Sequence, residues 1–229
     1  MTVQEIDFKD IPQLSFKDKA YQEGDAKYNG FFKYEANIES FGRAIKERNK
    51  FPTDRNLLVE VLHKQYEGTE FHKDVKDQIG ALGDPKCFTI TTAHQPVLLL
   101  GPLFVVYKIL SALHLCQSLK KKYSTYSFVP IFISGGEDHD FEEVATVHLF
   151  NRDFSWKTYQ EGSVGRMHTD DLRKVLDEVI SLFGNSPYAS ELISFINKSF
   201  DNSKTYAGFN IGLVNHLFSE MGLVVLNMD

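Results

Sequence analysis

Cys87-Phe88-Thr89-Ile90-Thr91-Thr92 is the stretch that decides the fold, because it is short, apolar and rich in β-branched residues. Such a run predicts a buried β-strand. An amphipathic segment that begins near Gly101-Pro102 and ends at Lys120-Lys121-Lys122 predicts a long helix. A second apolar run, Phe128-Val129-Pro130-Ile131-Phe132-Ile133, follows that helix. Strand, helix and strand at this spacing predict a βαβ unit with parallel strands, and therefore an α/β protein.

The carboxyl-terminal part of the chain adds further elements to this unit. A helix is expected from about Thr205 to Met221, and Leu223-Val224-Val225-Leu226 predicts another buried strand. Between the two regions, a small hairpin is expected to turn at Asn151-Arg152-Asp153. Because the last strand ends so close to Asp229, we expect a truncated protein with an unpaired sheet edge.

The amino-terminal third has a different pattern. The first thirty residues are polar and irregular, which predicts an extended arm. Helices are expected over 35–48, after an N-cap at Thr53, and after an N-cap at Thr69. We therefore divide the chain into an arm with a helical layer, residues 1–84, and a core, residues 85–229, that is incomplete at its carboxyl end.

The composition excludes several classes of protein. With 229 residues, of which 42% are hydrophobic and 24% charged, the chain is long enough to bury a core. Its composition is not that of a disordered or fibrous protein. A net charge of −6 argues against nucleic-acid binding, which needs a basic surface. No apolar run approaches the roughly 20 residues of a membrane span, and the acidic start does not resemble a signal peptide. A cytoplasmic protein with buried thiols at Cys87 and Cys116 is expected.

Polar residues follow the first predicted strand. Thr92, His94 and Gln95 lie at its carboxyl end, and Gly101 precedes the long helix. Free backbone N–H groups and the positive end of a helix dipole favour anionic groups at such a place. A histidine there can donate a hydrogen bond to a phosphate or stabilise charge in a transition state. The alternative is that His94 and Gln95 only cap the turn.

The second predicted strand is followed by two glycines and a dense group of ionisable side chains: Gly135, Gly136, Glu137, Asp138, His139 and Asp140. The glycines let the backbone turn sharply or pass close to a ligand. Like charges this close require a cation, a base partner or solvent. The group could bind Mg²⁺ with a phosphate, or act as a general base on an amine or hydroxyl nucleophile. Glu142 and Glu143 fit the simpler explanation, acidic residues on the solvated face of a first helical turn.

The remaining candidates are weaker. Arg166 follows a glycine in a predicted loop and could bind a phosphate or carboxylate, or only be solvated. The other helical histidines have no second ligand at i+4, so no metal site is expected from His63, His72, His114 and His216. The sequence contains no P-loop, no dinucleotide glycine fingerprint and no Gly-x-Ser-x-Gly elbow.

Several segments together resemble one family, the bacillithiol-biosynthesis cysteine-adding enzymes. Thr92-Ala93-His94-Gln95-Pro96 with Gly101-Pro102-Leu103 resembles the first signature of that family. The run from Glu137 to Glu143 resembles the second and is the most specific part. Val164-Gly165-Arg166-Met167 and the closing strand are similar to later family segments, in the same order.

The resemblance implies a Rossmann-like core and a ligase that adds cysteine to the amine of glucosaminyl malate. ATP is the suspected source of activation for the cysteine carboxylate, and a divalent metal is left open. The resemblance puts His94 and Gln95 at the nucleotide or carboxylate end. It makes the Glu137–Asp140 run face the aminosugar or assist the amine. Family members run further, through a coiled coil that pairs two subunits, so a homodimer is implied for full-length members.

Two rival hypotheses remain open at this stage. The chain could be a non-catalytic nucleotide or sugar-phosphate binding module, or a metal-dependent hydrolase that uses the acidic group. The ligase hypothesis depends on one geometric expectation: the segments after Thr92 and Ile133 leave adjacent parallel strands, so that His94 and Asp138 face a common crevice.

Overall fold

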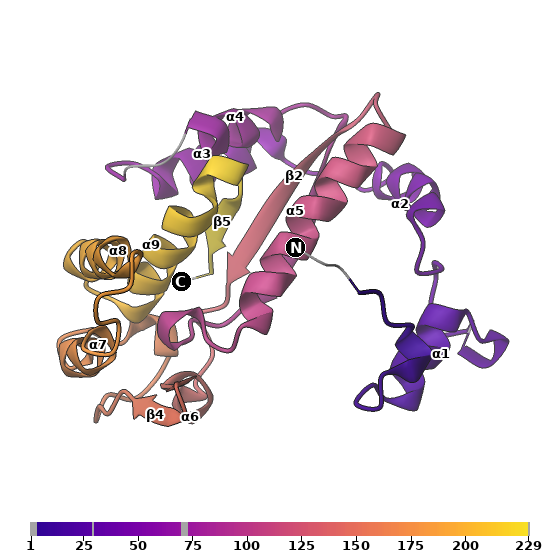
Figure 1. The fold of residues 1–229 in the computed structure, drawn as a ribbon. Helices are drawn as coiled ribbons and strands as arrows, with labels where there is room; N and C mark the ends of the chain where they lie inside the picture. Colours follow the sequence, from indigo (N-terminus) through magenta and orange to yellow (C-terminus); the bar gives the residue numbers. More distant parts are fainter. Residues whose placement is uncertain (1–3, 29, 70–72, 229) are drawn as a thin grey trace. The chain divides into compact units, whose positions relative to one another are not determined.

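The computed structural model describes residues 4–28, 30–69 and 73–228, and the chain forms two compact units, Met1–Thr53 and Asp54–Asp229. The second unit contains a three-stranded parallel sheet of β1 (Cys87–His94), β2 (Ser127–Ser134) and β5 (Val224–Asn227), in the order β1-β2-β5. The long helix α5 (Phe104–Lys122) connects β1 to β2 and lies alongside β2 (Figure 1). The predicted α/β fold with a parallel sheet is confirmed.

Pro130 lies within β2, where a missing backbone N–H would normally break a ladder. The Ser127 N–H donates to the carbonyl of Lys86, directly before β1, and the Gly135 N–H donates to that of His94, the last residue of β1. Alternation along the strand therefore turns the nitrogen of Pro130 toward the β5 side, and β5 begins to pair only at Ile131. The proline interrupts no hydrogen bond between strands, which explains why it is tolerated.

Helices cover both faces of the sheet. On one face, α3 (Arg55–Gln65) and α4 (Lys73–Ala81) pack on Val129, Ile131 and Val224. On the other face, α5 and α9 (Tyr206–Phe218) pack on Phe132 and Val225. The boundary expected at residues 84 and 85 therefore falls inside the second unit, because α3 and α4 bury their apolar side chains on the sheet.

The outer edge of β5 is closed by side chains. Gln65 donates to the Val225 carbonyl at 2.8 Å and accepts from the Asn227 N–H at 2.9 Å. The Tyr66 hydroxyl accepts from the Val225 N–H at 2.9 Å and donates to Asn215 at 3.0 Å. The expectation of an unpaired edge was wrong at the backbone groups of Val225 and Asn227, because the Gln65 amide and the Tyr66 phenol bond to them in place of a neighbouring strand.

The segment after β2 forms α6 (Phe141–Val144) and a hairpin of β3 (Thr146–Leu149) and β4 (Arg152–Ser155). The turn consists of Phe150 and Asn151, both with positive φ, so the predicted turn at residues 151–153 was placed too late. Two further helices then cover the core, α7 (Leu172–Ile180) and α8 (Ala189–Asp201). The short 3₁₀ helices are η1 Phe8–Asp10, η2 Ala26–Tyr28, η3 Ile38–Ser40, η4 Leu98–Leu100, η5 Val164–Arg166 and η6 Ser219–Met221.

The first unit holds α1 (Phe16–Glu23) and α2 (Phe41–Arg48). The prediction of an irregular arm was wrong at α1, which Ser15 and Asp18 begin with a capping box and Gly24 ends in a left-handed conformation.

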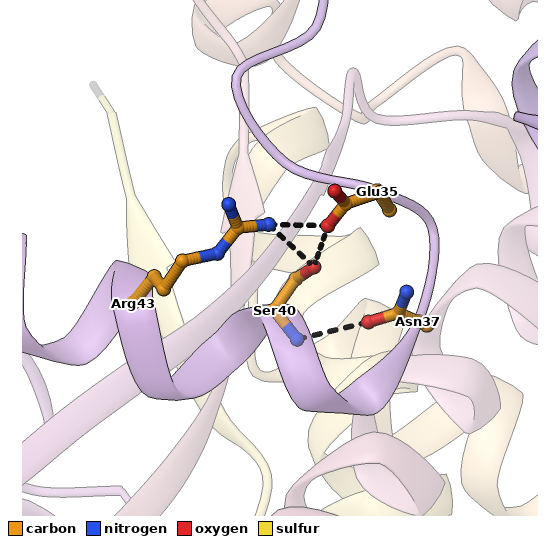
Figure 2. A network of polar contacts seen from close by, with 4 residues as sticks. All are labelled: Glu35, Asn37, Ser40 and Arg43. Atoms are coloured by element: carbon orange, nitrogen blue, oxygen red, sulfur yellow. Dashed lines mark hydrogen bonds and ion pairs between the residues drawn. The ribbon is translucent and has the colours of Figure 1, made fainter.

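A polar network fixes the start of α2 (Figure 2). Asn37 accepts from the Ser40 N–H at 2.9 Å, Ser40 donates to Glu35 at 2.8 Å, and Arg43 pairs with Glu35. The hydrogen bond from Ser40, together with the Arg43 charge, holds the pKa of the Glu35 carboxyl below its usual range.

Both cysteines are free and buried, as predicted, and burial raises the pKa of the Cys116 thiol to about 12. None of the helices in the described parts of the chain is both long and apolar enough to cross a membrane.

Candidate functional site

The carboxyl ends of β1 and β2 are direct neighbours. His94 lies opposite Ser134 in the strand register, and the Gly135 N–H donates to the His94 carbonyl at 3.0 Å. Both polar segments singled out in the sequence therefore begin at one edge of the same sheet, where open α/β folds place their ligands. This part of the geometric expectation is confirmed.

Two basic side chains lie at the end of β1, His94 of the strand itself and Lys108 of α5. The Nδ1 atom of His94 lies 3.0 Å from the Gln95 carbonyl, and its ring packs on Phe104 at a centroid distance of 5.3 Å. Lys108 on α5 donates to the Ala93 carbonyl at 2.6 Å. His94 is half-buried and Lys108 exposed, so the region is accessible and partly cationic.

The chain that follows His94 and Gln95 is packed into the core. Val97, Leu98 and Leu100 are buried. A Cβ atom on Gly101 would lie 2.9 Å from Cγ2 of Val147, closer than real contacts allow, so this glycine is needed for packing. Thr92 lies within β1, opposite Phe132. The structure thus gives Gly101 a packing role, and its predicted role in ligand binding stays a prediction.

The end of β2 is an exposed acidic turn. Glu137, Asp138, His139 and Asp140 are all exposed. Asp138 turns one carboxylate oxygen onto its own loop, where it accepts from the N–H of His139 at 2.7 Å and of Asp140 at 3.3 Å. This contact gives Asp138 a structural task in the turn. Asp140 stands at the N-cap of α6 but makes no side-chain cap bond.

A cavity of about 400 Å³ opens beside this turn; its lining residues are Glu137, His139, Gln160, Glu161, Ser163, Arg166 and Met167. Glu137, His139 and Arg166 were predicted as site residues, and the cavity brings these three together. The other four were missed. Their sequence signal is weak: a polar stretch with a glycine, from Gln160 to Ser163, typical of any loop between a hairpin and a helix.

Three hydrogen bonds join the two walls of the cavity. The carbonyl of buried Gly136 accepts from the Ser163 hydroxyl at 2.5 Å and from the Gly165 N–H at 2.8 Å. The carbonyl of Asp138 accepts from the Val164 N–H at 2.7 Å. Gly136 therefore supports the site through its backbone. At neighbouring Gly135, a Cβ would make only ordinary contact with the Glu137 carboxylate, at 3.5 Å.

A side-chain contact links the segments that follow the two strands. Gln95 donates to the Glu143 carboxylate at 3.3 Å. Neither His94 nor Asp138 lines the cavity, so a crevice shared by those two side chains stays a prediction. Glu143, which the sequence suggested to be a solvated helix residue, is the group that connects the ends.

In residues 4–28, 30–69 and 73–228, no group of three or more His, Cys, Asp or Glu side chains is placed to hold a metal ion. His63, His114 and His216 lie on separate helices, and His216 stacks on Phe195 at 4.7 Å. His72 lies outside the described residues.

Comparison with known proteins agrees with the fold. Residues 1–229 match the family described as bacillithiol biosynthesis BshC, N-terminal Rossmann-like domain. A protein of Flavobacterium psychrophilum is 38% identical over 204 residues, covering 86% of this chain and 38% of its own length. One of Cytophaga hutchinsonii is 33% identical over 231 residues, covering 100% of this chain and 42% of its own length. Both carry the name "Putative cysteine ligase BshC".

This chain therefore spans about two fifths of the length of these curated relatives. The parallel sheet, the polar ends of β1 and β2 and the match over the whole sequence lead to one conclusion. The chain belongs to the bacillithiol biosynthesis BshC family and corresponds to its N-terminal Rossmann-like domain.

Proposed function

We propose that this chain binds and orients the substrates of a ligase that joins cysteine to the amine of glucosaminyl malate. One observation carries the proposal: a carboxylate, an imidazole and a guanidinium line one cavity at the carboxyl end of β2, namely those of Glu137, His139 and Arg166. The curated relatives carry the name "Putative cysteine ligase BshC", which supports the same reaction class.

The cavity contains the groups that amide formation from an amine requires. The substrate amine is mostly protonated near neutral pH and must lose protons as the C–N bond forms. Glu137 and His139 are exposed at the cavity and are suited to accept such a proton. Arg166 is suited to pair with a carboxylate of the malyl group, because a guanidinium binds carboxylates through two parallel hydrogen bonds.

In this proposal, ATP is the co-substrate and binds at the end of β1 and not in the cavity. Glu137 and Glu161 line the cavity beside Arg166, and their charges oppose a triphosphate, with its several charged oxygens, more strongly than the carboxylates of a malyl group. His94 and Lys108 lie at the end of β1 and would hold those oxygens there. ATP would supply the free energy that activates the cysteine carboxylate. His94 and Gln95 then belong to the nucleotide or carboxylate end of the site.

A second candidate function follows from the share of the relatives that the chain covers. Because it matches only 38% and 42% of their lengths, the residues described could bind the aminosugar or the nucleotide without completing the reaction. In this second proposal the chain is a non-catalytic binding module.

One experiment separates the two candidates. The chain is incubated with cysteine, glucosaminyl malate and ATP, and the amide product is measured by mass spectrometry. In parallel, each ligand is titrated against the fluorescence of Trp156, the one tryptophan in the sequence. Trp156 is 2% exposed, and its ring lies 5.1 Å from that of Phe141, next to the acidic turn. Product formation supports the ligase, and binding without product supports the module. If neither glucosaminyl malate nor ATP binds, both candidates are wrong.

A further inference from the structure

The loop from Gln160 to His168 is closed by a single side chain. The Gln160 amide donates to the His168 carbonyl at 2.9 Å and accepts from the His168 N–H at 2.7 Å. The amide nitrogen also lies 3.1 Å from the Thr158 hydroxyl, to which it donates. Every polar group of this side chain is thus paired with protein, although Gln160 lies at the cavity.

The two ends of the loop are held differently. At Met167 and His168, the chain is tied to the start of α9: the Met167 carbonyl accepts from the Tyr206 N–H at 2.9 Å, and His168 forms a β-bridge with Thr205. Tyr206 is fully buried, so this end is fixed to the core. At the other end, the hydrogen bonds of Gln160 connect the chain to that fixed segment.

The closed loop in turn positions the acidic turn. Ser163, Val164 and Gly165 lie between the two ends, and these residues make the three hydrogen bonds to Gly136 and Asp138. The spacing between Glu137 and His139 on one wall and Glu161 and Arg166 on the other therefore depends on the conformation of this loop.

We infer that Gln160 is a positioning residue, which sets the distance between the two cavity walls by holding the loop closed. The inference deepens the proposed function and rests on it for the choice of ligand. A glutamine is required because a carboxylate cannot donate to the His168 carbonyl, and an asparagine is shorter by one methylene.

The chain offers a matched control. Gln65 also pairs its amide twice with backbone, at Val225 and Asn227 on the edge of β5. Removing either amide deletes two hydrogen bonds to backbone of similar length, and removing that of Gln160 also deletes the one to the Thr158 hydroxyl. The two glutamines differ in what they hold, since one closes a sheet edge and the other closes a cavity loop.

The test compares Gln160→Leu, Gln160→Glu and Gln65→Leu with the parent chain. Glucosaminyl malate is titrated by Trp156 fluorescence, and hydrogen exchange is measured at the Val164 and Gly165 amides. For Gln160→Leu we expect roughly tenfold weaker binding and faster exchange at both amides, the effect of losing the two hydrogen bonds to the His168 backbone that close the loop. For Gln65→Leu we expect a lower melting temperature with the Kd within about twofold of the parent value.

Gln160→Glu adds a readout that a general loss of stability would not change. The carboxyl group that this variant carries can donate a hydrogen bond once it is protonated. The ratio of the variant's Kd for glucosaminyl malate to the parent's Kd should therefore fall toward one as the pH is lowered toward about 4.5. Unchanged exchange at Val164 and Gly165 in Gln160→Leu would overturn the inference, as would equal losses of affinity in Gln160→Leu and Gln65→Leu. If the parent chain does not bind glucosaminyl malate, the proposed function fails, while the exchange comparison still decides whether Gln160 holds the loop.

Discussion

The ends of β1 and β2 look alike in the sequence and differ in the structure. In both places, an apolar strand is followed by polar residues and a nearby glycine. At β1, the chain returns into the core at once, with Val97, Leu98 and Leu100 buried. At β2, the chain stays exposed through Glu137–Asp140 and lines a cavity. The difference shows that a polar segment at the end of a strand lines a cavity only where the following chain leaves space.

The largest effect of a substitution is expected at the exposed end of β2, on the rate of ligation. Under the proposed function, Glu137→Gln removes a proton acceptor at the cavity, and we expect the rate of ligation to fall about a hundredfold, the usual scale of general base catalysis. Glu142→Gln is the matched control, because Glu142 is exposed on α6 and outside the cavity lining. Product formation followed by mass spectrometry measures both. Equal rates for the two variants would remove Glu137 from the chemistry.

The edge of β5, where the Tyr66 hydroxyl bonds to the backbone, extends the comparison to a buried polar group. Burial raises the pKa of Tyr66 to about 12, against an ordinary value near 10. The pKa of Tyr66 is higher in the folded state than in the unfolded state, because the buried phenol is held in its neutral form. Its contribution to stability is therefore fully present below about pH 10, the unfolded pKa. That stability, about 2 to 3 kcal/mol, is lost as the pH rises from about 10 toward 12.

Urea unfolding of the parent chain at several alkaline pH values measures this loss. Tyr66→Phe is the control, because it cannot ionise at this position and should show a smaller fall in the free energy of unfolding over the same range. Identical pH profiles for the two proteins would mean that the β5 edge is open to water.

Glycine substitutions compare the two strand ends directly. Gly101→Ala places a Cβ 2.9 Å from Val147 in the packed region, and we expect a loss of about 1 to 2 kcal/mol in the free energy of unfolding. Gly135→Ala places a Cβ 3.5 Å from the movable Glu137 side chain, and we expect a change within about 0.5 kcal/mol. Chemical denaturation measures both. If Gly135→Ala is the more damaging variant, the end of β2 is not the open one.

The strands could be predicted from the sequence because their signals are local. The apolar runs at 87–92 and 128–133 placed β1 and β2, and the short run at 223–226 placed β5, each within about two residues. The helix α1 was missed although its signals are also local: the Ser15 and Asp18 capping box and Gly24 were outweighed by the polar composition of the arm.

The cavity could be predicted only in part, because its far wall is fixed by contacts between distant residues. Arg166 was identified as a charged loop residue, but nothing local to Gln160 or Ser163 indicates a hydrogen bond to His168 or Gly136. The packing need of Gly101 depends in the same way on Val147, which belongs to the hairpin. The sequence therefore identified the wall that directly follows a strand, but only Arg166 of the wall that folds back onto it.

The smallest expected effect concerns the charge at the end of β1. Lys108 is exposed and bonds the Ala93 carbonyl, so Lys108→Met removes one solvent-screened cation from the region proposed for ATP. We expect ATP binding to weaken roughly three- to fivefold, the range of an exposed charge contact, while glucosaminyl malate binding is unchanged. Calorimetric titration of each ligand measures the two affinities. A parallel loss for both ligands would place them in one site, and the functional separation between the two strand ends would then be wrong.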